Sequence, residues 1–193
     1  MTRAILFFAI VAISINIWAQ QINTFIDHRD GKTYKTVEIG RQTWMAENLA
    51  YKPNNGNYWV YNNNISNLAN FGYLYDWQTA RNVCPKGWHL PSDDEWTELT
   101  NFVGNNPGIK LKAKSGWGHN GNGSDAYGFS ALPGGIRDER GTFHSINFMG
   151  IWWSVTAFNT NLAVYRDLRH DISYVGKSSY NKKSGFSVRC VRD

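Results

Sequence analysis

The stretch GYLYDWQTARNVCPKGWHLPSDDEW, residues 72–96, carries the strongest structural signals of the chain. Apolar residues at helical spacing predict a first helix over 71–83, and Pro85 ends it because proline cannot continue a helix. A second helix has clear starting chemistry. Ser92 stands at the N-cap position and Glu95 follows three residues later, which is the pattern of a capping box. The segment therefore predicts two helices joined by a short Cys-Pro connection.

The second helix is predicted to end at Gly104, a residue type common after the last helical turn. Trp96 and Leu99 stand at helical spacing and supply an apolar face for a core. Asp93 and Asp94 lie in the first turn, where the helix dipole favours negative charge. We therefore interpret this acidic run as helix-start chemistry rather than as a metal site.

Outward from this stretch, the chain has the pattern of strands and ordered loops. Alternating residues between 24 and 45, bounded by Asp-Gly and Gly-Arg turn signals, predict strands before the helices. An Asn-rich segment at 52–70 predicts a long ordered loop, and 115–124, with four Gly, predicts a surface loop. Further strands are expected at 129–132, 149–156, 163–169 and 186–192.

The composition is typical of a globular domain. The chain has 193 residues, of which 42% are hydrophobic and 18% charged, and it contains 9 Trp, 10 Tyr and 10 Phe. So many rings exclude a disordered chain, because they require a core. With 18 Gly and no heptad run, the sequence also excludes a coiled coil. No repeat or change of composition divides it, so one domain is expected.

Residues 1–19, MTRAILFFAIVAISINIWA, have the pattern of a signal peptide. Arg3 precedes an apolar run and Ala19 offers a small residue for cleavage, which predicts a mature domain over 20–193. The alternative is a membrane anchor, but the run is shorter than the ~20 residues of a spanning helix. We therefore expect export to the periplasm, the outer surface or the medium, with no transmembrane segment after cleavage.

The net charge argues against one class of partner. It is +5, from 20 Lys and Arg against 15 Asp and Glu. The basic residues are scattered rather than gathered in the dense stripe that is typical of nucleic-acid binding. Nucleic acid is therefore not expected as a partner.

Two cysteines, Cys84 and Cys190, are present. In an exported chain an even number predicts a disulfide, and two residues allow one pairing. On the chain-entropy model, a cross-link that closes so long a loop would add about 4–5 kcal/mol. The alternative is a catalytic thiol at Cys84, for which His89 is the one nearby base in sequence. We predict the disulfide.

Five blocks of sequence, in order along the chain, resemble a known family. They are TWMAENLAY (43–51), GYLYDWQTARNVCPKGWHLPSDDEW (72–96), GFSALPGGIRDERGTF (128–143), GIWWSVTAF (150–158) and GFSVRCVRD (185–193). Together they resemble the Fibrobacter succinogenes major paralogous domain, a family of exported bacterial proteins. The central block is also similar to the C-type lectin-like fold and to its formylglycine-generating-enzyme relatives.

This resemblance implies a fold. It implies an α+β, C-type-lectin-like single domain, with two helices and a small twisted antiparallel sheet with long irregular loops. In that fold a cysteine at the end of the first helix pairs with one in the last strand. Cys84 and Cys190 occupy those two places, so the resemblance implies the same disulfide as the cysteine count.

The functional residues of the wider fold group do not carry over. Calcium-dependent lectins carry E-P-N or Q-P-D and then W-N-D, but here Trp152-Trp153-Ser154 stands in the last place. Formylglycine-generating enzymes use two C-terminal cysteines, and this chain has one. The 5 His show no metal-ligand spacing, and no G-x-S-x-G elbow is present. We expect no enzyme, no metal and no cofactor, with a structural ion elsewhere as an alternative.

Two functions of different classes remain. The first is a non-catalytic module that binds a glycan or a surface protein at the cell envelope, since rings stack on sugars and Asn hydrogen-bonds hydroxyls. The second is a structural or assembly component of an envelope complex, without a small ligand. Most tryptophans are expected to fill the core instead, namely Trp44, Trp77, Trp88, Trp96, Trp152 and Trp153.

The candidate ligand-binding residues lie within 156–181, between two predicted strands. They mix Asn, Tyr and Arg, a set suited to adaptable recognition. They are Asn159, Asn161, Tyr165, Arg169, Tyr174 and Tyr180. In the distantly similar retroelement-diversified variable proteins, the binding face comes from the equivalent part of the chain. The alternative is a meander with half of its side chains packed inward. Nothing in the sequence points to an oligomeric state.

Overall fold

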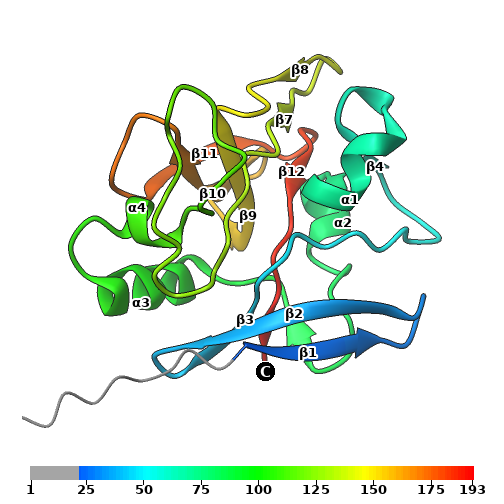
Figure 1. Ribbon diagram of the computed structural model, residues 1–193. Helices are drawn as coiled ribbons and strands as arrows, with labels where there is room; N and C mark the ends of the chain where they lie inside the picture. The colour runs from blue at the N-terminus through cyan, green and yellow to red at the C-terminus, as the bar shows by residue number, and fades with distance from the viewer. Residues whose placement is uncertain (1–21) are drawn as a thin grey trace, which may run out of the picture.

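Strands contain more residues than helices in the computed structural model, which describes residues 22–193 (Figure 1). The first six strands are β1 (Ile22–Asp27), β2 (Lys32–Ile39), β3 (Gln42–Met45), β4 (Tyr58–Trp59), β5 (Leu74–Tyr75) and β6 (Trp88–His89). The others are β7 (Ile136–Arg137), β8 (Phe143–His144), β9 (Met149–Ala157), β10 (Leu162–Arg169), β11 (Gly176–Asn181), β12 (Phe186–Ser187) and β13 (Val191–Arg192). The helices are α1 (Leu68–Phe71), α2 (Trp77–Ala80), α3 (Asp93–Val103) and α4 (Pro107–Leu111), with 3-10 turns at η1 (Tyr61–Asn63) and η2 (Ile65–Asn67). The signal peptide predicted for residues 1–19 lies outside the described residues.

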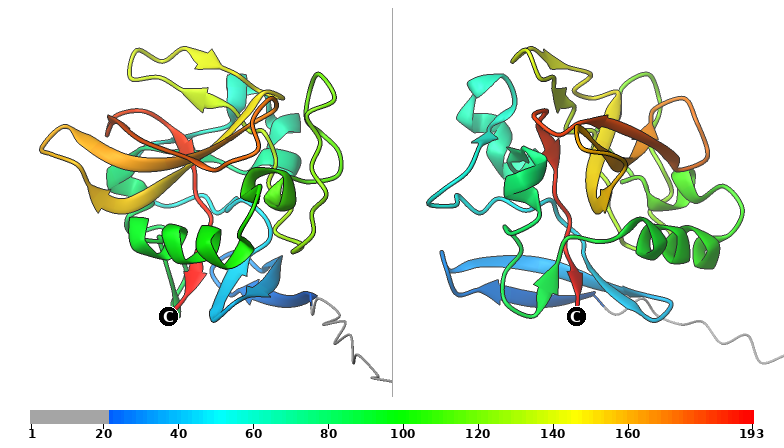
Figure 2. Two further views of the ribbon diagram at one scale, coloured as in Figure 1. Left: turned by 90° about the vertical axis from the view of Figure 1, so that its left-hand side faces the viewer. Right: turned by 180° about the vertical axis from the view of Figure 1, so that it is seen from behind.

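The strands form three sheets. One has five strands in the order β1-β2-β3-β13-β6, the second has six in the order β11-β10-β9-β12-β5-β4, and β7 pairs with β8. Neighbouring strands are antiparallel except β12 and β9, which are parallel. Because β12 and β13 belong to different sheets, the C-terminal segment, red in Figure 2, crosses from the six-stranded to the five-stranded sheet.

This architecture shows that the expected α+β, C-type-lectin-like domain with two helices and a small sheet is wrong. Helices make up 17% of the structure, and the two larger sheets have five and six strands. Seven of the strands contain two residues each, and strands so short leave no alternating pattern in a sequence. Within residues 22–193, no helix has the length and apolar character needed to cross a membrane.

The first predicted helix, 71–83, is also wrong. The chain there is divided between the end of α1, strand β5 and the short helix α2. Leu74 and Tyr75 pair with both β12 and β4. The Asp76 side chain then accepts a hydrogen bond from the backbone N–H of Thr79 at 2.8 Å and begins α2. Pairing with distant strands overrides the helical spacing of these apolar residues.

The second helix forms as predicted. Ser92 Oγ accepts a hydrogen bond from the backbone N–H of Glu95 at 3.1 Å. The Glu95 carboxylate accepts one from the backbone N–H of Ser92 at 2.7 Å, which completes the capping box. Gly104 follows the last helical residue with a φ of 71°, which favours glycine. Trp96 and Leu99 are fully buried.

The remaining strand predictions hold in part. β2 and β3 lie in the predicted 24–45 region and β1 overlaps its start, and β9 and β10 match the two longer C-terminal predictions. The strand predicted at 186–192 is divided into β12 and β13, because the chain leaves one sheet for the other between them. The strand predicted at 129–132 forms one isolated bridge, at Ala131.

Two apolar clusters fill the core, and β9 contributes to both. The adjacent residues Trp152 and Trp153 belong to different clusters, because successive side chains of a strand point to opposite faces. Trp153 stacks on Phe186 with ring centroids 4.1 Å apart. The ring centroids of Trp152 and Trp96 are 6.1 Å apart. The six tryptophans predicted to fill the core are all buried, namely Trp44, Trp77, Trp88, Trp96, Trp152 and Trp153.

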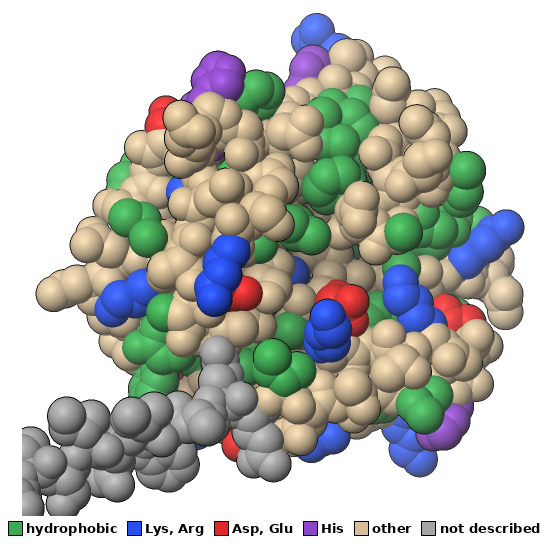
Figure 3. All heavy atoms as spheres, viewed as in Figure 1, with side chains coloured by type: hydrophobic (Ala, Val, Ile, Leu, Met, Phe, Trp, Pro, Cys, Tyr) green, Lys and Arg blue, Asp and Glu red, His purple; other side chains and the backbone are tan. Residues whose placement is uncertain are grey.

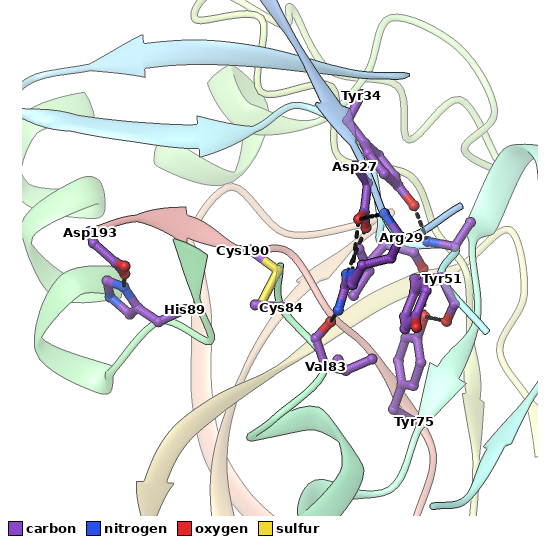
Figure 4. The surroundings of a disulfide bond; sticks show 12 residues. Asp27, Arg29, Tyr34, Tyr51, Tyr75, Val83, Cys84, His89, Cys190 and Asp193 are labelled. Atoms are coloured by element: carbon purple, nitrogen blue, oxygen red, sulfur yellow. Dashed lines mark hydrogen bonds and ion pairs between the residues drawn. A yellow bond between two sulfur atoms is a disulfide. The ribbon is translucent and has the colours of Figure 1, made fainter. Parts of the chain in front are cut away.

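The predicted disulfide is present (Figure 4). The Cα atoms of Cys84 and Cys190 are 6.0 Å apart, although 106 positions separate them in sequence. Nearby, Arg29 forms an ion pair with Asp27 at 2.6 Å and donates a hydrogen bond to the carbonyl of Val83 at 2.8 Å. The disulfide joins the segment before β6 to the chain between β12 and β13. The hydrogen bond from Arg29 joins the β1–β2 turn to the same segment before β6.

Candidate binding site

All six predicted ligand-binding residues lie on the β9–β10–β11 meander. β9 pairs with β10 and β10 pairs with β11, in both cases antiparallel. β11 is the edge strand of the six-stranded sheet. Val164, Arg166 and Leu168 of β10 are buried, so the meander also packs part of its side chains inward.

Three of the six residues line one pocket of about 210 Å³: Tyr165, Arg169 and Tyr174. Arg169 and Tyr174 are exposed, whereas Tyr165 is half-buried. The Tyr165 ring lies 5.4 Å from that of Phe186, measured between centroids, so the core holds it in place. The other lining residues are Asp167, Ile172, Gly176, Lys177 and Ser178.

Asp167 is the buried acidic residue of this pocket. Its side chain is 3% exposed, and its Oδ2 accepts a hydrogen bond from Arg169 Nε at 2.9 Å. This hydrogen bond raises the pKa of Arg169. The other oxygen, Oδ1, accepts no hydrogen bond from residues 22–193. Because an ionised carboxylate can accept several hydrogen bonds, Asp167 keeps acceptor capacity for a ligand.

Gly176 explains how the Asp167 carboxylate fits beside the neighbouring strand. It is the β11 partner of Asp167, and a Cβ at this position would lie 2.2 Å from Asp167 Oδ1. The glycine therefore leaves the space that the carboxylate occupies. Asp167 was not among the residues predicted from the sequence, although alternation signals it: Tyr165, Asp167 and Arg169 stand at every second position of one strand and so share a face.

The opposite face of this hairpin is fixed to α3 by ion pairs. One Asp93 oxygen lies 2.6 Å from Arg166 Nη2, and the other lies 2.5 Å from Lys177 Nζ. Arg166 also donates a hydrogen bond to Thr97 Oγ1 at 2.7 Å. Burial alone would raise the pKa of Asp93, but the hydrogen bonds from Lys177 and Arg166 outweigh it and lower that pKa. The helix thus anchors the strands that carry the pocket.

The other three predicted residues do not line the pocket. Asn159 Oδ1 accepts hydrogen bonds from the backbone N–H groups of Asn161 and Leu162, both at 2.8 Å, and so shapes the β9–β10 turn. Asn161 belongs to the same turn. Tyr180 is half-buried, with its ring centroid 5.6 Å from that of Phe186, and packs against the core. The structure therefore brings together three of the six residues.

A larger hollow, of about 770 Å³, lies between the β2–β3 turn and α3. Two of its charged lining residues, Arg41 and Glu98, pair with each other at 3.2 Å, and the third is Asp94. Phe102 is exposed on its wall and lies against Gly40. None of its lining residues is a buried carboxylate like Asp167. The smaller pocket on β10 and β11 therefore offers a ligand stronger polar contacts.

Between residues 22 and 193, no three His, Cys, Asp or Glu side chains are grouped in a way that could hold a metal ion. The acidic residues at the start of α3 have other partners: Asp93 pairs with Arg166, and Glu95 lies 2.7 Å from His89. The pocket on β10 and β11 presents one carboxylate acceptor, one guanidinium donor and two phenol rings. Lys177 and Ser178 also line it, and the Lys177 ammonium is paired with Asp93.

Comparison with known proteins places the whole site in one family. The model of the Fibrobacter succinogenes major domain matches residues 37–192. The chain belongs to this family. The matched range begins in β2 and ends in β13, so the family domain includes the β9–β10–β11 meander and both cysteines. The resemblance seen in the five sequence blocks is thus confirmed. No curated protein and no solved structure matches this member of the Fibrobacter succinogenes major domain family.

Proposed function

We propose that this member of the Fibrobacter succinogenes major domain family is an exported, non-catalytic binding domain that recognises a glycan at the cell envelope or surface. Its binding site is the pocket of Tyr165, Asp167, Arg169 and Tyr174. The observation that carries the proposal is the buried Asp167 carboxylate, which has one oxygen bound by Arg169 and the other without a donor among residues 22–193.

The polar pair suits adjacent hydroxyl groups. A hydroxyl both donates and accepts, so one can donate to Asp167 Oδ1 while its neighbour accepts from Arg169. Hydrogen bonds to charged groups are about twice as strong as those between neutral groups. The rings of Tyr165 and Tyr174 supply apolar surface for the C–H groups of the same sugar.

The size of the pocket indicates how much of a glycan it holds. Its volume of about 210 Å³ is below the ~300–1,000 Å³ of pockets for drug-sized molecules. We therefore expect it to recognise one sugar unit, at the end or at the side of a longer chain.

The surroundings favour a preformed site. Asp93 fixes the hairpin to α3 through Arg166 and Lys177, and the ring of Tyr165 rests on Phe186. A site whose side chains are already held in place loses less conformational entropy on binding. The binding free energy from two or three contacts is therefore not cancelled by an entropic cost of ordering these side chains.

A glycan array with the purified protein tests this function. We expect binding to a limited set of glycans, and loss of that binding in the triple variant Tyr165→Ala, Arg169→Ala and Tyr174→Ala. Arg140→Ala, at the exposed β7–β8 turn, is the matched control and should bind normally. Binding to no glycan, or equal binding by a folded triple variant, would contradict the proposal. The glycan recovered after incubation should be chemically unchanged, since the proposed domain is not an enzyme.

Export is a separate part of the proposal. Expression in a bacterial host followed by N-terminal sequencing of the exported protein should show a mature chain that begins at Gln20. A protein that stays in the cytoplasm with residues 1–19 attached would contradict export while leaving the binding proposal open to the array.

A further inference from the structure

A second polar pocket, of about 310 Å³, shares no lining residue with the Asp167 pocket. It lies where β2, the segment after β3 and α1 meet the chain between β12 and β13. Three of its lining residues are basic, Lys32, Lys35 and Arg189, and Glu47 is its one acidic lining residue. The pocket therefore carries an excess of positive charge.

Arg189 is a buried cation whose protein partners are neutral. The residue is 1% exposed. Its guanidinium donates hydrogen bonds to the backbone carbonyls of Phe129 and Ser130 and to Asn48 Oδ1. No Asp or Glu oxygen between residues 22 and 193 lies within 4.0 Å of the guanidinium. Its Nε–H has no hydrogen-bond partner among the same residues.

The neutral partners leave the charge of Arg189 incompletely compensated. The guanidinium carbon lies 4.3 Å from the ring centroid of Phe129 and 5.7 Å from that of Trp152. Ring faces attract a cation but supply no counter-charge. Burial lowers the pKa of Arg189 to about 9, although the Asp125 and Glu47 carboxylates act in the opposite direction, so the group is still charged at neutral pH. Asp125 and Glu47 act on Arg189 without forming an ion pair with it, and a buried charge without a direct ion-pair partner is costly. A bound anion would reduce that cost.

The rest of the pocket also favours an anion. Glu47 Oε2 already accepts a hydrogen bond from the backbone N–H of Lys35 at 2.7 Å. The Lys35 residue is exposed, so its ammonium is accessible to a ligand from solution. Lys32 Nζ lies 5.1 Å from the ring centroid of Tyr34 and forms no ion pair with residues 22–193.

We propose that this pocket binds a small oxyanion, the carboxylate, sulfate or phosphate group of a ligand. Arg189 supplies the buried charge and the Nε–H that lacks a protein acceptor, and Lys32 and Lys35 attract the anion from solution. The proposal goes beyond glycan recognition and rests on different residues, so either proposal can fail without the other.

The direct probe is the Nε–Hε resonance of Arg189 in protein labelled with nitrogen-15. Sodium sulfate, phosphate and acetate are titrated separately against chloride at a constant ionic strength of about 0.15 M, which keeps screening equal. We expect at least one of the three to shift this resonance to saturation with a Kd of about 1 mM or below. The arms distinguish tetrahedral sulfate and phosphate from planar acetate. Arg189→Lys assigns the resonance, or contacts to the Phe129 ring protons do so if that variant fails to fold.

A matched pair of variants separates the site from general charge effects. Lys32→Gln with Lys35→Gln should weaken anion binding at least several-fold, because two attracting charges are removed from the pocket. Lys86→Gln, at an exposed position outside the pocket, should leave binding unchanged. A bound anion should raise the thermal unfolding temperature of wild type and Lys86→Gln more than that of the double lysine variant. This is expected because a ligand that binds the native state stabilises it more as its occupancy rises.

Two results would overturn this inference. In the first, sulfate, phosphate and acetate all leave the Arg189 resonance unchanged, which would mean that carbonyls and rings satisfy the guanidinium. In the second, an anion stabilises the protein but acts equally on the double lysine variant and leaves the Arg189 resonance in place. Either result assigns Arg189 a purely structural role.

Discussion

Arg169 Nε donates a hydrogen bond to Asp167 Oδ2 at 2.9 Å, from two residues further along the same face of β10. The Asp167 side chain is 3% exposed and that of Arg169 is 47% exposed. The pair thus joins a buried acceptor to an accessible donor in one pocket. On the face of the molecule drawn in Figure 3, Lys and Arg side chains lie apart from one another.

Gly176→Ala should disturb this pair directly. The added Cβ would lie 2.2 Å from Asp167 Oδ1 and 2.8 Å from its Cγ, so the carboxylate must move. We expect a loss of about 1–3 kcal/mol in the free energy of unfolding and weaker glycan binding. Gly134→Ala is the control, because its Cβ would meet no atom closer than 3.4 Å. Unchanged stability and binding in Gly176→Ala would contradict the described packing.

Removal of the disulfide should destabilise the domain. Cys84→Ser or Cys190→Ser frees a loop of 106 positions in the unfolded chain, and we expect a loss of about 2–5 kcal/mol in the free energy of unfolding. Urea denaturation with and without reductant measures the change. Reduced wild-type protein should resemble either variant, and wild-type stability that does not respond to reductant would be the contrary result.

The capping box of α3 should contribute a smaller amount. Ser92→Ala removes the acceptor for the backbone N–H of Glu95 and the hydroxyl that donates to Glu95 Oε2 at 2.9 Å. We expect a loss of about 1 kcal/mol in chemical denaturation. Ser66→Ala, at an exposed position, is the comparison and should change stability little. Equal effects of the two substitutions would argue against the cap.

His89 should make stability depend on pH. Its Nδ1 lies 2.7 Å from Asp193 Oδ1, and its Nε2 lies 2.7 Å from Glu95 Oε1. Burial alone would lower the pKa of His89, but the hydrogen bonds to Asp193 and Glu95 outweigh it and raise that pKa above 6.5. Because the pKa is higher in the folded than in the unfolded state, the stabilisation is complete below the unfolded value and is lost as pH rises through the folded value.

The measurement compares wild type with His89→Gln across pH. The difference in free energy of unfolding should be larger at about pH 5.5 than at about pH 8.5, on either side of the ordinary histidine pKa. At Glu95, burial is outweighed by hydrogen bonds from Ser92 and His89, which lower its pKa. The stabilisation that ionised Glu95 contributes is therefore lost at acid pH, as the pH falls through the pKa of Glu95 in the folded state. A difference that grows toward alkaline pH would contradict the bridge.

The sequence predicted the features that depend on local chemistry. The start of α3 could be predicted because Ser92 and Glu95 satisfy each other within one turn. The disulfide could be predicted because two cysteines allow one pairing. The buried tryptophans followed from their size, since so many rings require a core.

What the sequence did not predict depends on pairing between distant segments. Leu74 stands at helical spacing with Trp77 and Ala80, yet Leu74 and Tyr75 form a strand because β12 and β4 lie on either side of them. Alternation puts Asp167 on one face with Tyr165 and Arg169, but its burial depends on the pairing that places Gly176 opposite it. Asn159 and Tyr180 have types suited to binding, but one shapes a turn and the other packs on the core.

The central claim is that Asp167 and its neighbours bind a sugar, and titration calorimetry with the strongest array glycan tests it most directly. Asp167→Asn keeps the shape of the side chain but removes the charge that pairs with Arg169. We expect this variant, folded as judged by unchanged near-UV circular dichroism, to bind at least tenfold more weakly, which corresponds to about 1.4 kcal/mol. Arg140→Ala should bind like wild type. A folded Asp167→Asn protein with wild-type affinity would show that Asp167 does not bind the sugar.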